Sequence, residues 1–97
     1  MPAFMTRVVL HNGDRDDYEE LHQYMSDEGF VKTITDENAT WELPDAMYDY
    51  RTNDEKVTTL SVREKAKGAA NKTKKGNTVF TVKYTAWSSM GLTKASP

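Results

Sequence analysis

Two segments with helical periodicity, each bordered by segments with strand periodicity, constrain the fold of this chain most strongly. The first helix is predicted over residues 14–28, where an acidic start favours the positive end of the helix dipole. Its apolar stripe consists of Tyr18, Leu21, His22 and Met25. Asp14 is placed to cap this helix, and Gly29 is a suitable residue just beyond its end.

The second helix has two possible starts in the sequence. Asn53 could cap an early start, but Ser61-Val-Arg-Glu64 has the pattern of a capping box directly before a helical stripe, and we favour it. The stripe is narrow and consists of Val62, Ala66, Ala69, Ala70 and Thr73. Small side chains of this kind let a helix lie close to a sheet. The segment 72–77 then ends the helix.

Strand periodicity occupies the segments between the helices. Residues 3–11 predict a first strand with Phe4, Thr6, Val8 and Leu10 on one face. Residues 30–35 and 40–43 predict a hairpin around a turn at 36–39. Pro44 indicates a bulge, an edge or a strand end, after which residues 46–50 could resume the strand. A last strand is predicted over residues 78–87.

The order of these elements is β-α-β-β-α-β. Right-handed crossovers then place both helices on one face of a sheet. We therefore predict an α+β, ferredoxin-like fold with a four-stranded antiparallel sheet and two helices on one face. At 97 residues the chain has room for a single domain, residues 1–97, with an ordered core of about residues 3–87 and an irregular tail over 88–97.

Composition limits the cellular context and the kinds of site. The chain has no cysteine, so neither disulfides nor cysteine-type zinc sites are possible. No apolar run is long enough to cross a membrane and no signal-peptide pattern opens the chain, so we expect a cytoplasmic protein without membrane contact. The apolar fraction of 37% leaves room for further burial in a homodimer.

Charge is divided along the chain. Residues 1–55 carry fourteen acids and four bases, whereas residues 56–97 carry nine bases and one acid. Arg63, Lys67 and Lys74 fall roughly together on the second helix and its end, away from the alanine stripe. Such a cluster can bind the phosphates of RNA, or it can simply be a solvated helix face. The low pI of about 5.6 weakens the first interpretation.

The segment from His11 to Asp17 is the first candidate for chemistry. It brings an imidazole and three carboxylates to one edge of the predicted sheet, where they could hold Mg²⁺ or move protons at a phosphodiester. The alternative is a turn followed by a capped helix. His11 and His22 lack a third ligand at a suitable spacing, so we predict no metal site, and we expect His22 to pack against the core.

Aromatic side chains are the other candidate. A ferredoxin-like sheet has one face without helices, and aromatic residues there can stack on single-stranded bases. The same residues could instead form the core or a dimer interface. They are Trp41, Tyr48, Tyr50, Tyr84 and Trp87. The chain has no Walker-type or dinucleotide-binding glycine loop and no nucleophile elbow, so we predict no cofactor.

Several motifs together resemble one family. They are Arg7-Val-Val-Leu-His-Asn, Tyr18-x-x-Leu21-His22-x-x-Met25, Gly29-Phe30-x-x-Thr33-Ile34, Leu43-Pro44-x-Ala46-x-Tyr48 and Ala66-x-x-Ala69-Ala70-Asn71. Over residues 6–86 the chain resembles the GhoS-type antitoxins, the endoribonuclease antitoxins of type V toxin–antitoxin systems. The resemblance implies a ferredoxin-like fold similar to that of small CRISPR-associated nucleases, and cleavage of the message for a membrane-active toxin. Those nucleases carry an aspartate near the end of their first strand. Here that strand ends at His11 and the nearest acid is Asp14, which is a departure from a metal-dependent mechanism.

Two functional hypotheses follow. In the first, the chain is an RNA-acting antitoxin that cleaves or binds a toxin message. His11 and Asp14 would do the acid–base work. Arg7, Arg15 and Arg51 would bind the RNA, and Arg7, Arg15 or Arg51 would stabilise charge on the phosphorane. In the second, it is a non-enzymatic interaction module, such as a phage or prophage accessory protein, that acts by self-association or protein binding.

Overall fold

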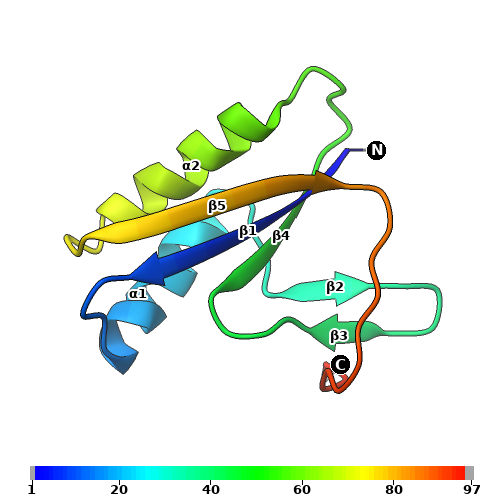
Figure 1. The fold of residues 1–97 in the computed structure, drawn as a ribbon, viewed down its shortest axis with the longest axis horizontal. Coiled ribbons are helices and arrows are strands. Elements are labelled where there is room, and N and C mark those ends of the chain that lie inside the picture. The colour runs from blue at the N-terminus through cyan, green and yellow to red at the C-terminus, as the bar shows by residue number, and fades with distance from the viewer. Residues whose placement is uncertain (1, 96–97) are drawn as a thin grey trace.

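The computed structural model describes residues 2–95 of the chain (Figure 1). Two helices and five strands follow one another along the sequence. They are β1 (Ala3–Leu10), α1 (Arg15–Asp27), β2 (Thr33–Thr35), β3 (Thr40–Glu42), β4 (Met47–Arg51), α2 (Thr59–Asn71) and β5 (Asn77–Tyr84). Met1 and residues 96–97, which belong to the predicted domain and tail, lie outside the described residues.

The main sheet has three antiparallel strands in the order β4-β1-β5. β1 is the central strand, and it pairs with β5 along its whole length, from Ala3 opposite Tyr84 to Leu10 opposite Asn77. β4 covers only the first part of the other edge of β1, ending with Met47 opposite Arg7. β5 ends at Tyr84 instead of the predicted residue 87 because β1 begins at Ala3 and offers no partner further along.

The predicted four-stranded ferredoxin-like sheet is wrong. β2 and β3 form a separate two-stranded sheet, and the strand beside β1 is β4, which the sequence suggested only as a resumption of the hairpin strand. The chain turns between β3 and β4, where Ala46 has a positive φ of 65° and Met47 N donates to Pro44 O. β2 therefore does not extend the main sheet, and the hairpin meets β4 through an isolated bridge between Val31 and Asp49. The α+β class is confirmed.

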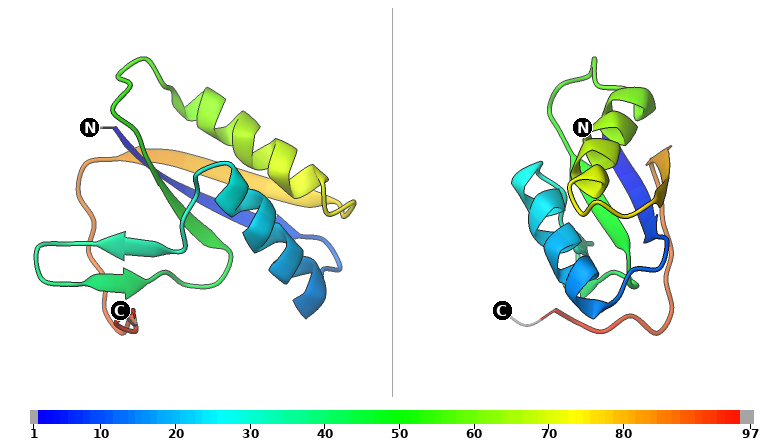
Figure 2. Two further views of the ribbon diagram at one scale, coloured as in Figure 1. Left: turned by 180° about the vertical axis from the view of Figure 1, so that it is seen from behind. Right: turned by 90° about the vertical axis from the view of Figure 1, so that its left-hand side faces the viewer.

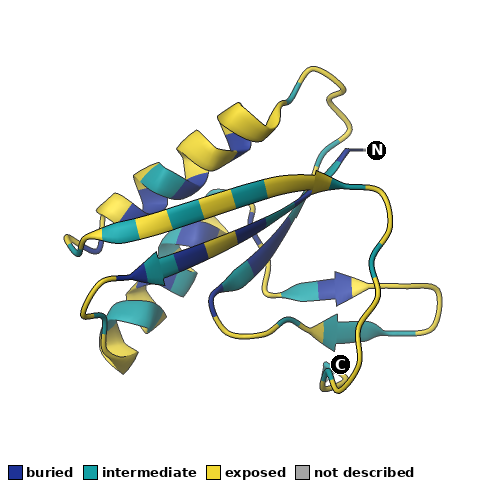
Figure 3. Cartoon of the chain, viewed as in Figure 1, coloured by how far each residue is buried: buried dark blue, intermediate teal, exposed yellow. Residues whose placement is uncertain are grey.

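Both helices lie on the same side of the three-stranded sheet (Figure 2). The predicted inner face of β1 is confirmed, since Phe4, Thr6, Val8 and Leu10 are all buried (Figure 3). They pack with the buried stripes of the two helices, which are Leu21 and Met25 of α1 and Val62, Ala66, Ala69 and Ala70 of α2. Because the α2 stripe is mostly alanine, this helix packs closely on β1 and β5.

The helix ends follow from local hydrogen bonds. The cap at Asp14 is confirmed, because its carboxylate accepts from the amide of Asp17, and Gly29 has the positive φ, 93°, that follows many helix ends. The start predicted for the second helix is wrong by three residues. Thr58 caps α2. Its hydroxyl oxygen accepts from the amide of Ser61, and its own amide donates to Ser61 Oγ, in a capping box that lies one turn before the predicted one.

Residues 85–95, which follow β5, form no helix or strand of their own, but they are hydrogen-bonded to β3. Glu42 N donates to Thr93 O, and Ala95 N donates to Thr40 O. An isolated bridge joins Trp41 to Lys94. The C-terminal segment therefore lies along the hairpin, as Figure 1 shows. Neither helix of residues 2–95 has the length and apolar composition needed to cross a membrane.

The position of the α2 cap gives a stability prediction. We expect Thr58→Ala to lower the free energy of unfolding by about 1 kcal/mol, because the amide of Ser61 loses its acceptor. Glu64→Ala, which removes the acid of the capping box predicted from sequence, should change it by less than about 0.5 kcal/mol, since within residues 2–95 Glu64 pairs only with the exposed Arg63. Urea denaturation measures both. Equal losses for the two variants would contradict this assignment.

Candidate phosphate-binding cleft

Asp14 and His11, the residues predicted to move protons, each have a local partner. Asp14 Oδ1 accepts from the amide of Asp17 at 2.9 Å, and Asp17 Oδ2 accepts from the amide of Asp14 at 3.0 Å. His11 Nε2 lies 3.0 Å from the hydroxyl of Thr78 on β5. In residues 2–95 no hydrogen bond joins His11 to Asp14, so the structure does not bring the pair together as one catalytic unit.

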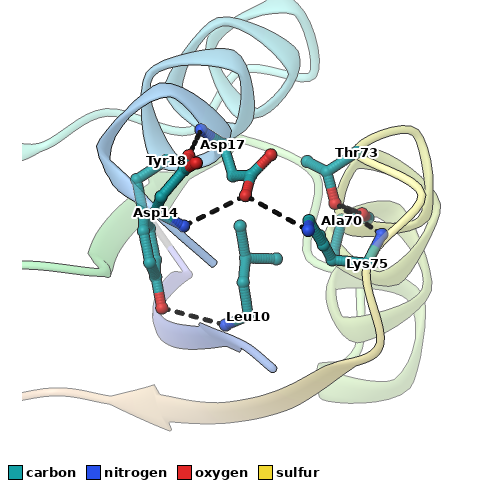
Figure 4. A network of polar contacts seen from close by, with 7 residues as sticks. All are labelled: Leu10, Asp14, Asp17, Tyr18, Ala70, Thr73 and Lys75. Carbon is teal, nitrogen blue, oxygen red and sulfur yellow. Dashed lines mark hydrogen bonds and ion pairs between the residues drawn. The ribbon is translucent and has the colours of Figure 1, made fainter. Parts of the chain in front are cut away.

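The acidic start of α1 is a structural junction (Figure 4). Lys75, from the turn after α2, lies 3.6 Å from the Asp17 carboxylate and links the two helical segments. The amide of Asp14 and the charge of Lys75 lower the pKa of Asp17. On the other side, Tyr18 Oη accepts from the amide of Leu10 at 3.0 Å, which fixes the exit of β1 against α1. The capped-helix interpretation therefore accounts for Asp14 and Asp17.

The three cations predicted on the second helix take separate positions. Arg63 contacts Glu64 at 2.6 Å, and Lys67 donates to the side chain of Asn77 at 2.7 Å. Lys74 lies in the turn beyond α2, with a positive φ of 65°. Two of the three thus have partners within the fold, and α2 does not present them as a joint site.

Arg51 is held by a buried acid. Its Nε donates to Asp49 Oδ2 at 3.0 Å, and Asp49 is only 3% exposed. Tyr84 donates to the other oxygen of the same carboxylate. Burial, together with the hydrogen bond to Asp49 and its negative charge, raises the pKa of Tyr84 to about 12. The network joins β4 to β5 across β1, and Arg51 balances the buried charge within it.

Arg7 and Arg15, in contrast, meet in one cleft of about 540 Å³. Because β4 begins only at Met47, the last part of β1 has no strand beside it on that edge. The cleft forms there between β1, α1 and the segments that flank the hairpin. Its lining consists of Arg7, Val9, Arg15, Tyr18, Glu19, His22, Lys32, Asp45 and Ala46.

The cleft has a mixed charge with an excess of cations. Arg7, Arg15 and Lys32 supply three positive charges, and Glu19 and Asp45 supply two negative ones. Sequence reasoning missed Lys32, Glu19 and Asp45 because they come from three segments with no common motif. In residues 2–95 no group of three His, Cys, Asp or Glu side chains is arranged to hold a metal ion. The arrangement suits a phosphate held by arginine and lysine.

His22 lies half-buried in the wall of this cleft. Its Nδ1 is 2.6 Å from Tyr48 Oη. One side of the ring therefore packs against the core, the role predicted from the helix stripe, and the other side faces the cleft. Burial is the main cause that lowers the pKa of His22, and the nearby charge of Lys32 adds to it. Burial also raises the pKa of Tyr48. His22 is therefore neutral at neutral pH, and it faces a cleft rich in cations.

The aromatic residues divide between the core and the surface. Tyr48 and Tyr50 pack against Phe30, with ring centroids 6.5 and 5.0 Å from it. Trp41 Nε1 donates to Asp36, the residue that also shapes the hairpin turn. On the sheet face opposite the helices, Phe80 of β5 is 65% exposed. Phe80 is thus an exposed aromatic residue of this open face, and the stacking hypothesis did not name it.

Comparisons with protein-family models, with curated proteins and with solved structures found no match to this chain.

Proposed function

We propose that this chain is an RNA-acting antitoxin that binds single-stranded RNA in the cleft and cleaves it there. The observation that supports the proposal is the convergence of Arg7, Arg15 and Lys32 on one cavity large enough for a phosphate and its sugar. The proposal agrees with the resemblance to the GhoS-type antitoxins, from which the toxin message as target is taken. Single-stranded RNA suits the cleft better than a duplex, because a flexible backbone can bend into a narrow opening.

The cleft also holds groups that could move a proton. Glu19 or Asp45 would accept the proton of the ribose 2′-hydroxyl, whose oxygen then bonds to phosphorus. The bond from phosphorus to the 5′-oxygen breaks, and that oxygen takes a proton from water. Arg7 and Arg15 would stabilise the added charge of the phosphorane. The products are a 2′,3′-cyclic phosphate end and a 5′-hydroxyl end.

A second function, self-association through the open face, is favoured by a different observation. Phe80 and Val82 of β5 are 65% and 38% exposed, and Val82 lies beside Met5 on the same face. An apolar groove of about 380 Å³ continues this surface under the C-terminal segment. In a twofold dimer the same surface patch of both copies meets, so that patch must be complementary to itself. A face that carries both a projecting side chain and a groove meets this requirement.

RNA binding gives the first test. Arg7→Ala and Arg15→Ala should each weaken binding of a labelled single-stranded RNA, and each should reduce the slope of log affinity against log salt by about 0.7, because one phosphate contact is lost. Fluorescence anisotropy between low and moderate salt measures both effects. Arg63→Ala is the matched control, since it removes the same charge from α2 and should leave the slope unchanged. An equal loss for Arg63→Ala would show that the cleft is not the binding site.

Cleavage gives the second test. Pure protein incubated with a mixed RNA pool should produce cyclic phosphate ends, with EDTA present or absent, because the cations of the cleft are its own side chains. Activity should fall at least about a hundredfold in the double variant Glu19→Gln, Asp45→Asn. The double variant His11→Ala, Asp14→Ala should keep its activity, given that these side chains are engaged elsewhere. If instead the second double variant is the inactive one, the reaction takes place at the end of β1 and not in the cleft.

Self-association gives the third test. Sedimentation of the wild-type protein should show a dimer at high concentration, and Phe80→Glu should abolish it because two copies would bring carboxylates together in an apolar contact. Leu60→Glu is the control, since Leu60 is 56% exposed on α2, on the helix side of the sheet. A dimer that survives Phe80→Glu does not use the open face.

A further inference from the structure

The hydrogen bond between His22 and Tyr48 fixes which ring nitrogen faces the cleft. Nδ1 lies 2.6 Å from the phenol oxygen, which belongs to a side chain that is only 1% exposed. The two rings are 5.8 Å apart, centroid to centroid, and tilted by 58°. Since Nδ1 is directed into the protein, Nε2 is the nitrogen left for a molecule bound in the cleft that His22 lines.

The same hydrogen bond also selects the tautomer. Among residues 2–95, the Tyr48 hydroxyl has His22 as its hydrogen-bond partner and no other. If Nδ1 carried the proton, the hydrogen of a buried phenol would have no acceptor, which is costly in the interior of a protein. If the phenol donates to Nδ1, that hydrogen is satisfied, and the neutral imidazole must carry its own proton on Nε2.

Burial is the main reason why the ring of His22 is neutral. Burial and Lys32 lower the pKa of His22, and together they outweigh Glu19 and Asp45, which act in the opposite direction. Arg7 and Arg15 line the same cleft and add positive charge. The phenol of Tyr48 stays protonated, since burial raises its pKa. In a protonated imidazole Nδ1 would donate to Tyr48 Oη, which would again leave the phenol hydrogen without an acceptor.

We infer that His22 binds a phosphate oxygen of the RNA through Nε2–H, as a neutral hydrogen-bond donor whose tautomer is set by Tyr48. The inference rests on the proposed function and specifies the role of one residue in it. It assigns His22 to phosphate recognition and leaves proton transfer to the carboxylates. A neutral N–H donor makes a directional hydrogen bond and adds no charge. It therefore favours a correctly placed phosphate oxygen over any other anion near the three cations.

Nitrogen NMR of the free protein tests the tautomer directly. In the spectrum of the His22 ring, Nδ1 should resonate as an unprotonated nitrogen and Nε2 as a protonated one, between about pH 6.5 and 8. Tyr48→Phe should remove this preference and give an average of the two tautomers. A wild-type ring protonated at Nδ1, or one that is charged in this pH range, would overturn the inference.

RNA binding by matched variants tests the role of the donor. His22→Gln places an amide N–H near the position of Nε2, whereas His22→Asn places one near Nδ1. We expect His22→Gln to bind labelled single-stranded RNA within about threefold of wild type, and His22→Asn and His22→Ala to bind about tenfold more weakly, the effect of one hydrogen bond to a charged group. Circular dichroism confirms that each variant is folded. Equal affinity for wild type and His22→Ala would overturn the assignment.

A titration with inorganic phosphate separates this inference from the proposed function. If the wild-type protein binds no RNA, the proposed function fails, but the Nε2–H proton signal should still shift as phosphate is added. Arg7→Ala should weaken that shift, because it removes one of the cations that hold the anion in the cleft. An Nε2–H signal that does not move at saturating phosphate shows that His22 does not bind the anion.

Discussion

The hydrogen bonding of β1 on both of its edges is the constraint on which the rest of the structure depends. β5 pairs with the whole strand, whereas β4 pairs only with its first five residues, up to Arg7. On the β4 side the ladder ends where the amide of Val8 donates to Ala46 O at 2.9 Å, at the residue whose positive φ turns the chain away. This early end leaves the last part of β1 without a neighbouring strand on that edge. The cleft occupies that place, so its position follows from the length of one strand.

Much of the local structure could be predicted from the sequence because it depends on neighbouring residues. Alternation along β1 identified its buried face, and the spacing of Val62, Ala66 and Ala69 identified that of α2. Strand pairing could not be predicted in the same way. Whether residues 40–43 or 47–51 lie beside β1 depends on the turn at Ala46, and a positive φ at an alanine has no sequence signature. The ferredoxin-like prediction failed at this point.

The candidate site was predictable only in part, for a related reason. Arg7 and Arg15 were predicted to bind RNA, and the structure places both in the lining of one cleft. Lys32 and Asp45 reach the same cleft from the two ends of the hairpin, which no spacing along the chain could indicate. Asp14, in contrast, has a strong local signal as a cap, and the structure uses it as one. Because its carboxylate already caps α1, Asp14 is less available for acid–base chemistry.

The division of charge along the sequence leads mainly to ion pairs between the two helical segments. Lys65 lies 3.8 Å from Glu28 and Lys75 lies 3.6 Å from Asp17, so basic residues in and after α2 face acidic residues in and after α1. Pairs this exposed contribute little to stability, but they reduce the field that α2 presents to an approaching polyanion. The cleft carries only one excess positive charge in a chain with a net charge of −2. Under the proposed function, long-range attraction of RNA would therefore be weak, and affinity would have to come from short contacts inside the cleft. Contacts to a phosphate fix the position and orientation of the backbone but carry no sequence information directly, so selecting one RNA segment over another would require contacts to its bases.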